Sequence, residues 1–182
     1  MAMEFRRMTR DDLPAILRIQ SASYVGNLTH EQRAQGFLSA EYSAGELARM
    51  ADDVAVMVAA GDGRVLGFLC ASSPALGADF PIVARMIAQF GQIDFRGRPL
   101  DRWRVMIYGP VCVDPAARGR GAVRGLFEEL KRAAADRFDA GAALVAEDNP
   151  HSMHVHVTRL GMEPVGEFHH QGKRFTILAF AL

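Results

Sequence analysis

The chain has 182 residues, of which 49% are hydrophobic and 23% are charged. This balance is typical of a globular protein, and we expect residues 1–182 to form a single domain. The 21 basic and 21 acidic residues give a formal net charge of zero, so there is no broad basic surface for nucleic acid or an anionic membrane. No apolar run reaches membrane-spanning length, and the N-terminus lacks an apolar leader. The two cysteines lie in apolar runs, and we expect a reduced, cytoplasmic protein.

The first half of the chain predicts strands and helices in alternation. Gly61-Asp62-Gly63 separates two apolar, β-branched runs, which predicts an antiparallel hairpin. Ser43 offers a helix cap three residues before Glu46. The expected elements are a strand at 4–8, a helix from Thr9 to about Tyr24, two short helices within 29–50 that are interrupted near 36–43, and strands at 54–60 and 65–71.

The second half predicts a mixed sheet covered by helices. Residues 80–90 have a helical pattern, whereas residues 91–99 contain turn residues and arginines and predict a mobile loop. The remaining elements are a strand at 104–113, a Gly-Arg-rich turn, a helix at 121–138, a strand at 142–146, a short helix that begins near Pro150, and strands at 164–168 and 174–182 joined through 169–173.

The most informative segment, residues 111–124, reads VCVDPAARGRGAVR. An apolar strand stops at Asp-Pro, a basic glycine-containing turn follows, and apolar residues then recur at helical spacing. The first amides of a helix lack internal partners and hold phosphate oxygens well. Arg118, Arg120 and Arg124 would add charge-assisted hydrogen bonds. The alternative is a plain strand-to-helix turn with solvated arginines, since the segment has neither a Walker nor a Rossmann pattern.

A second polar segment follows the strand at 142–146. It begins with Asn149-Pro150-His151-Ser152 and continues through His156 to Leu160-Gly161-Met162. Five of the six histidines lie near the C-terminus, and His151 and His154 have the spacing of one helix face. No cysteine or convincing carboxylate completes a metal-binding set, so we expect no metal.

These two segments resemble motifs A and B of the GNAT acyl-CoA N-acyltransferases. In motif A, V-x-V-x-P precedes Q/R-x-x-G-x-G/A; Arg118 and Gly121 match its first and fourth positions, whereas Val123 replaces the usual Gly or Ala at the sixth. In motif B, N-x-x-A/S-x-x-x-Y precedes a Gly-Phe pair. Its matches are Asn149, Ser152 and Gly161, with Met162 in place of the aromatic residue and one extra residue before Leu160.

The resemblance implies an α/β fold with a mixed, mainly antiparallel sheet of about seven strands flanked by helices. It also implies acetyl-CoA as co-substrate. The backbone of Val111, Cys112 and Val113 would then pair with the pantetheine arm like an added strand. The other residues that this resemblance assigns to the cofactor are Arg118, Gly119, Arg120, Gly121, Ala122, Val123 and Arg124 around the pyrophosphate, together with Asn149 and Ser152.

The catalytic assignments are more open. His156 stands where many relatives carry a tyrosine that protonates the leaving thiolate, and an imidazole is suited to that work; packing or cofactor contact is the alternative. Leu144 stands where some relatives carry a glutamate base. Glu147 or its neighbour Asp148, Tyr108 or water would take its place, and Cys112 is expected to be a core thiol rather than a nucleophile.

The expected reaction is direct transfer of an acetyl group from acetyl-CoA to a primary amine, with a small-molecule acceptor ranked first. The acceptor is expected beside the first two helices and residues 72–100. A catalytically degenerate acyl-CoA-binding regulatory module is one alternative, and an acetyltransferase for protein N-termini or lysines is another. The sequence leaves open whether the chain forms a homodimer.

Overall fold

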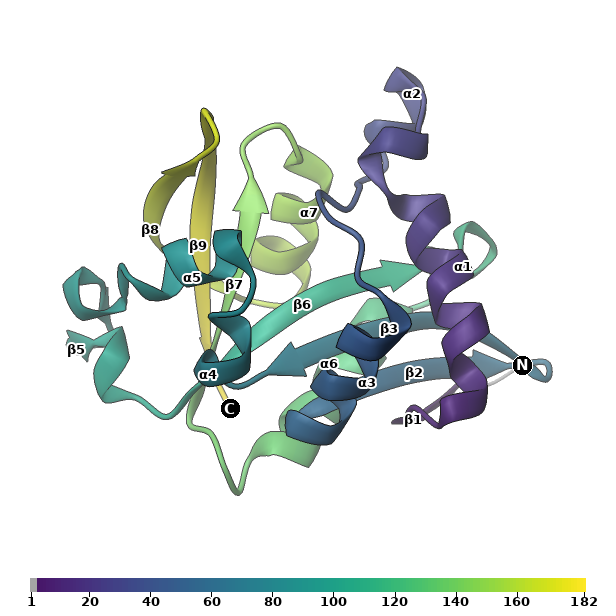
Figure 1. The fold of residues 1–182 in the computed structure, drawn as a ribbon, viewed down its shortest axis with the longest axis horizontal. Coiled ribbons are helices and arrows are strands. Elements are labelled where there is room, and N and C mark those ends of the chain that lie inside the picture. The colour runs from purple at the N-terminus through teal and green to yellow at the C-terminus, as the bar shows by residue number, and fades with distance from the viewer. Residues whose placement is uncertain (1–2) are drawn as a thin grey trace.

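A computed structural model describes residues 3–182 of the chain (Figure 1). The first elements in chain order are β1 (Glu4–Arg7), η1 (Arg10–Asp12), α1 (Leu13–Ser23), η2 (Val25–Asn27), α2 (His30–Arg33), α3 (Ala44–Asp53), β2 (Ala55–Gly61) and β3 (Arg64–Ser72). A segment of short elements follows, with α4 (Pro74–Gly77), α5 (Pro81–Ile87), η3 (Phe90–Gln92), β4 (Asp94–Phe95), β5 (Arg98–Pro99) and η4 (Leu100–Arg102). The last part contains β6 (Val105–Val113), η5 (Pro115–Ala117), α6 (Ala122–Ala134), β7 (Ala140–Ala146), α7 (Pro150–His154), η6 (Val155–Arg159), β8 (Glu163–His170) and β9 (Lys173–Ala181).

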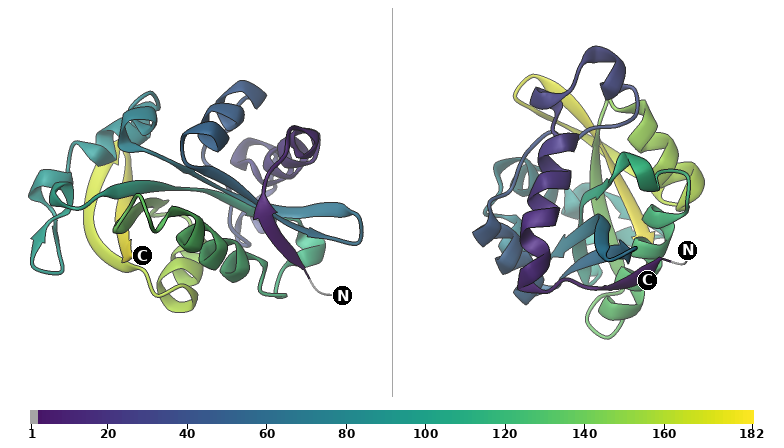
Figure 2. Two further views of the ribbon diagram at one scale, coloured as in Figure 1. Left: turned by 90° about the horizontal axis from the view of Figure 1, so that it is seen from below. Right: turned by 90° about the vertical axis from the view of Figure 1, so that its right-hand side faces the viewer.

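Seven strands form one sheet in the order β1-β2-β3-β6-β7-β9-β8. All neighbours are antiparallel except β6 and β7, which are parallel. The expected α/β fold with a mainly antiparallel sheet of about seven strands is therefore confirmed. Figure 2 shows α1 and α3 on one face of the sheet and α6 and α7 on the other. Separate apolar clusters fill the space on the two faces.

Three hairpins share one kind of tight turn. Their turn pairs all take positive φ angles, which is the geometry of two-residue hairpin loops and favours glycine at the second position. The pairs are Asp62 (54°) and Gly63 (73°) between β2 and β3, Arg96 (52°) and Gly97 (85°) between β4 and β5, and Gln171 (50°) and Gly172 (76°) between β8 and β9. The hairpin expected from Gly61-Asp62-Gly63 is confirmed. The last turn is tighter than the expected connection at 169–173, so β8 is longer than the strand predicted at 164–168 and β9 starts one residue before the strand predicted at 174–182.

Helix α6 packs against the middle of the sheet through one apolar stripe. Leu126, Phe127, Leu130 and Ala134 are buried against β2 and β3, as their helical spacing predicts. The helix ends at Ala134, four residues before the predicted end, because the chain must turn there to start β7. None of the helices within residues 3–182 combines the length and apolar character required to cross a membrane.

Strand β7 starts two residues before the predicted strand at 142–146. Ala140 and Gly141 are weak strand formers, so sequence pattern hides this start. They pair with Val105 and Met106 on one side and with β9 on the other. A side chain at Gly141 would collide with the ring of Phe180, since an added Cβ would lie 2.2 Å from Phe180 Cζ. Close packing explains the glycine in this strand.

The prediction of a mobile loop at residues 91–99 is wrong. This segment contains η3 and the β4-β5 hairpin. Phe95 is 1% exposed, and its ring centroid lies 5.2 Å from that of Trp103. The Arg98 guanidinium lies 3.6 Å from the centroid of the Trp103 ring. Ile93 packs against Gly166 of β8. Two buried apolar residues among turn-forming ones fix the segment against the sheet, and local composition did not reveal this.

Asp12 joins the first strand to the first helix. Its carboxylate accepts two hydrogen bonds from the guanidinium of Arg6, at 2.7 and 3.0 Å, and one from the backbone N–H of Thr9 at 2.7 Å. The residue is 7% exposed. The hydrogen bond from Arg6, followed by those from Thr9, outweighs burial and lowers the pKa of Asp12. The ionised carboxylate therefore stabilises the junction.

Replacing Asp12 with Ala should lower the free energy of unfolding by about 1–3 kcal/mol, because the charge-assisted bonds from Arg6 and Thr9 are lost. Since the pKa of Asp12 is lowered in the folded state, this stability is present above the ordinary carboxyl pKa and is lost as pH falls through the lowered one. Urea unfolding of both proteins across acid and neutral pH measures the difference. The exposed neighbour provides a control, Asp11→Ala, and equal effects of the two changes would contradict the assignment.

Candidate active site

The sheet opens between β6 and β7. These parallel strands pair through only three residue pairs, from Val105 and Ala140 to Ile107 and Ala142. Beyond this point they point in different directions (Figure 1). On its other side β6 stays paired with β3 as far as Val113. Residues 108–113 therefore border an opening in the sheet, with backbone groups that face no neighbouring strand on that side.

A bulge in β6 lies where this pairing ends. Leu69 of β3 is opposite Val111 and Ala71 is opposite Tyr108, so Gly109 and Pro110 together occupy the place of one residue. Gly109 has a φ of 108°, which side chains other than glycine rarely adopt. Proline has no N–H to contribute to a ladder. Bulges bend a strand and change the direction of its side chains, as is common beside active sites.

One side of the opening leads to a cavity of about 600 Å³, called the basic cavity below. Its lining comes from the turn before α6, from the start of α6, and from α7 and η6. The arginine and histidine side chains among its lining residues are Arg118, Arg124, His151, His154, His156 and Arg159; no aspartate or glutamate of the described chain lines it. Burial, followed by the charges of Arg118 and His154, lowers the pKa of His151. The cavity is therefore suited to a polyanion.

The turn before α6 has the backbone that the sequence predicts for anion binding. Gly119 and Gly121 have φ angles of 72° and 83°, and an added Cβ on either would meet nothing within 4 Å. Gly121 caps α6, whose first amides open toward the basic cavity. The side chain of Val123 packs partly against the core while the residue lines the cavity. Arg124 donates from Nη2 to the carbonyl of Arg159 at 2.7 Å, which joins α6 to η6.

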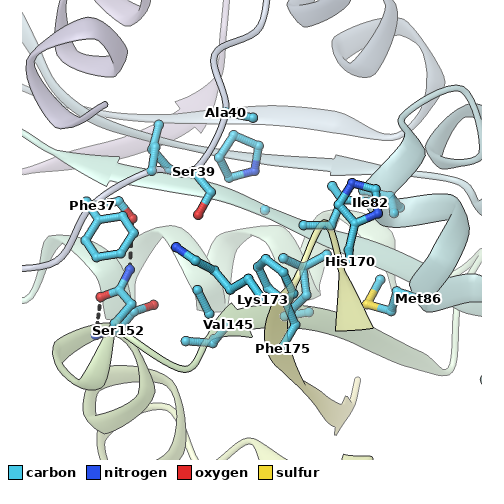
Figure 3. Close-up of a pocket in the computed structure, with 18 of the residues that line it drawn as sticks. Phe37, Ser39, Ala40, Ile82, Met86, Val145, Ser152, His170, Lys173 and Phe175 are labelled. Carbon is cyan, nitrogen blue, oxygen red and sulfur yellow. Dashed lines mark hydrogen bonds between the residues drawn. The ribbon is translucent and has the colours of Figure 1, made fainter. Parts of the chain in front are cut away.

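The other side of the opening leads to a cavity of about 510 Å³, called the apolar cavity below. Ile82, Val83 and Met86 of α5 form one wall and Phe175 of β9 forms another (Figure 3). Lys173 and His170, which flank the turn between β8 and β9, also line this cavity, and Figure 3 shows His170 beside Ile82. Acidic residues are absent from the described lining. This cavity is suited to an apolar molecule with a small number of polar groups.

The two cavities meet at a junction formed by residues that line both, which are Phe37, Leu38, Val111, Ser152 and His156. His156 is 5% exposed. Its Nδ1 lies 2.7 Å from the carbonyl oxygen of Ser152, and a carbonyl only accepts, so Nδ1 carries the hydrogen. Nε2 is then left as an acceptor. Burial, partly offset by this hydrogen bond, lowers the pKa of His156 and keeps the ring neutral at pH 7.

A π-helical turn carries His156 into this position. The helix that begins at Pro150 continues as η6, where the N–H of Leu160 bonds to the carbonyl of Val155 at 3.1 Å and the N–H of Met162 bonds to that of His156 at 3.0 Å. The wider turn accommodates the extra residue that the sequence shows before Leu160. Such turns occur frequently at functional sites.

Asn149 joins three parts of the site. Its side-chain Oδ1 accepts from the N–H of Ser152 at 3.2 Å and so caps α7. Its Nδ2 donates to the carbonyl of Phe37 at 2.9 Å, which holds residues 35–38 against the opening. The residue is 5% exposed. The sequence predicted Asn149 and Ser152 but not Phe37, because 112 positions separate Asn149 from its partner.

The remaining predicted catalytic residues lie differently. Tyr108 is buried, and its ring packs edge-to-face against that of His156, with 5.4 Å between the ring centroids. Burial raises the pKa of Tyr108. The Tyr108 hydroxyl has no hydrogen-bond partner among the described residues. Glu147 lines neither cavity and lies 3.3 Å from the Arg174 guanidinium. Neither arrangement favours a base. Burial raises the pKa of Cys112 to about 12, as expected for a core thiol.

Two further features distinguish the site from the sequence prediction. Arg120 does not line either cavity, whereas Arg159, which was not predicted, lines the basic one. The sequence signal for Arg159 was weak, because its place in the cavity depends on contacts between distant segments. In the part of the chain that the structure describes, no three His, Cys, Asp or Glu side chains are grouped so that they could hold a metal ion.

Several solved structures share this fold. An N-acetyltransferase from Staphylococcus aureus Mu50 is 17% identical, with a TM-score of 0.66 and coverage of 100% of this chain and 99% of that one. A GNAT superfamily phosphinothricin acetyltransferase from Sinorhizobium meliloti, solved in complex with AcCoA, is 20% identical, with a TM-score of 0.65 and coverage of 100% and 89%. A ribosomal-protein-alanine N-acetyltransferase from Brucella melitensis is 20% identical, with a TM-score of 0.63 and coverage of 98% and 99%.

The fold and the opening in its sheet are those of an acyltransferase. Residues 13–162 match the profile of the Acetyltransferase (GNAT) family, which is most of the chain, and the protein belongs to this family. No curated protein matches the chain at a significant level. The family resemblance inferred from the two sequence motifs is thus confirmed.

Two substitutions at Asn149 separate its two bonds. Asn149→Asp keeps the acceptor that caps α7 but removes the donor to Phe37, so hydrogen exchange should rise in residues 35–40 and stay low in α7. Asn149→Ala removes both bonds and should raise exchange in both segments. Hydrogen–deuterium exchange with mass spectrometry measures this difference. Identical exchange patterns in the two variants would show that the bond to Phe37 does not hold the segment.

Proposed function

We propose that the protein transfers an acetyl group from acetyl-CoA to the primary amine of a small molecule by direct attack, within the single domain expected from the sequence. The observation that carries the proposal is the junction, where the buried and neutral His156 stands between a basic and an apolar cavity. A polyanionic donor and an apolar acceptor would meet beside its free Nε2. The small-molecule assignment is supported by the apolar cavity, which α5, β7 and the β8-β9 hairpin surround.

The lining of the basic cavity suits the charge of coenzyme A. Its arginines and the amides at the start of α6 would hold the pyrophosphate, through the predicted residues Arg118, Gly119, Gly121, Ala122, Val123 and Arg124. Arg159 extends the same positive lining toward η6, and His151 and His154 add ring nitrogens that can hydrogen-bond to phosphate oxygens. The open backbone edge at Val111–Val113 would pair with the amide-containing pantetheine arm, as an added strand does.

Acetyl-CoA would supply the thioester that the amine attacks. His156 would accept a proton from the attacking nitrogen at Nε2, because Nδ1 already donates to Ser152. The new bond joins nitrogen to the acyl carbon, the carbon–sulfur bond breaks, and the imidazolium returns the proton to the leaving sulfur. A single imidazole would serve as base and then as acid, which removes the need for Glu147 or Tyr108. No covalent enzyme intermediate is required.

The arginine assignment makes a binding prediction. Arg118→Ala should raise the KM for acetyl-CoA by on the order of ten-fold with a small effect on kcat, because it removes one charge-assisted contact to phosphate. Isothermal titration with acetyl-CoA gives the affinity directly. Arg132→Ala, in the last turn of the same helix, provides the control because Arg132 lines neither cavity. Unchanged affinity in the Arg118 variant would remove this residue from the phosphate site.

The proton-transfer role predicts a different pattern. His156→Phe should lower kcat by about 10²- to 10⁴-fold with little change in acetyl-CoA affinity. In the unmodified enzyme, kcat should fall as pH decreases through the lowered pKa of His156, below the ordinary imidazole range, because protonation removes the acceptor. The variant should lose this acidic limb. Thiol release followed across pH measures both effects.

The control is His169→Phe, because His169 is exposed and lines neither cavity. Circular dichroism and thermal unfolding establish that each variant is folded. A folded His156→Phe enzyme with full turnover would refute the proton-transfer role while leaving the cofactor assignment intact. Absence of binding by any CoA species to the unmodified protein would instead contradict the proposed donor.

A further inference from the structure

The described lining of the apolar cavity contains a basic side chain and no acidic one. Lys173 is the only lysine or arginine among its described lining residues, and these include no aspartate or glutamate. Ile82 and Met86 on α5 and Phe175 on β9 give it apolar walls, and its other polar lining includes Ser39, His170 and Gln171. A cavity with this lining disfavours polyamines and other polycationic acceptors, because no carboxylate in it would neutralise a second ammonium group. The acceptor amine also reacts only in its neutral form, which such surroundings favour.

Lys173 reaches into the cavity from the start of β9. Figure 3 shows its ammonium end directed toward Ser39 and Phe37, opposite the apolar walls. The Nζ atom lies 6.0 Å from the centroid of the Phe37 ring, and Phe37 belongs to the junction. Its ion-pair partner is Asp148, at 2.8 Å, and both side chains are partly exposed, at 39% and 52%. Ion pairs of this kind hold weakly, so a second carboxylate can compete for the ammonium group.

On the basis of the proposed function, we infer that the acceptor is an amino acid with an apolar side chain, whose carboxylate binds Lys173. The amino group would lie at the junction beside His156, and the side chain would lie against Ile82, Met86 and Phe175. Each of these three parts of the ligand has a matching part of the cavity: a neutral imidazole acceptor, a cation and an apolar wall. A cation that meets the carboxylate also fixes the direction in which the amine enters.

The test is calorimetric titration of the protein saturated with CoA, using phenylalanine, phenylalaninamide and phenethylamine. The last two lack the carboxylate, and their amines are respectively less and more basic than that of phenylalanine. Phenylalanine should bind about ten- to a hundred-fold more tightly than either, as expected for a charge-assisted contact. Because one comparator amine is less basic and the other more basic, tighter binding of phenylalanine than of both cannot arise from amine basicity. Equal affinities would overturn the inference.

Variants identify the cation. Lys173→Met should remove the preference for phenylalanine, and Lys173→Arg should retain most of it. Asp148→Asn should strengthen phenylalanine binding without affecting phenylalaninamide, because it removes the competing carboxylate. The chain has one other lysine, Lys131 on α6, and Lys131→Met is the matched control. An unchanged preference in Lys173→Met would overturn the assignment to this residue.

Turnover separates this inference from the proposed function. Thiol release from acetyl-CoA is measured in parallel with phenylalanine, phenethylamine and spermidine. Turnover of phenethylamine or spermidine in preference to phenylalanine would contradict the inference and leave N-acetyl transfer standing. Tight phenylalanine binding that depends on Lys173, with no thiol release from any amine, would contradict the proposed function and support a carboxylate-binding site.

Discussion

The separation of β6 and β7 is the constraint on which the site depends. A continuous sheet would satisfy the backbone groups of both strands, but here parallel pairing stops at Ile107 and Ala142 while β3 still holds the other edge of β6. The bulge at Gly109 and Pro110 lies at this point. The opening exposes strand backbone to a ligand and brings α6 and α7 to the same gap. Few other places in a sheet offer unpaired backbone next to a helix N-terminus.

Electrostatic asymmetry across the opening follows from this arrangement. The turn before α6, the start of α6, α7 and η6 supply arginines and histidines to one cavity, whereas α5 and β9 supply apolar side chains to the other. Between them, His156 loses its hydration on burial, and its pKa falls. An imidazole that remains neutral, with its tautomer fixed by the carbonyl of Ser152, can accept a proton and return it.

The segment between β3 and β6 shows how a connection becomes part of a site. Antiparallel neighbours need only a two-residue turn, yet residues 73–104 join these strands and form α5 and the β4-β5 hairpin. The segment stays in place because Phe95 and Leu100 are buried, and α5 then forms a wall of the apolar cavity. The composition of residues 91–99 predicted a mobile loop, because most of these residues are turn-forming. A prediction from local sequence does not show that a few of the apolar residues are buried against distant parts of the chain.

The sequence by itself determined the elements with strong local signals. These were the hairpin at Asp62, the turn at Gly121, the stripe on α6 and the two family motifs, because capping, turn chemistry and periodicity act over a few residues. Tertiary structure decided what depends on distant contacts. It brought Asn149 to Phe37 and placed His156 between two cavities, and it turned Glu147 toward Arg174 instead. Burial and partner choice are properties of the packed chain, so the tautomer and the pKa of His156 depend on the fold.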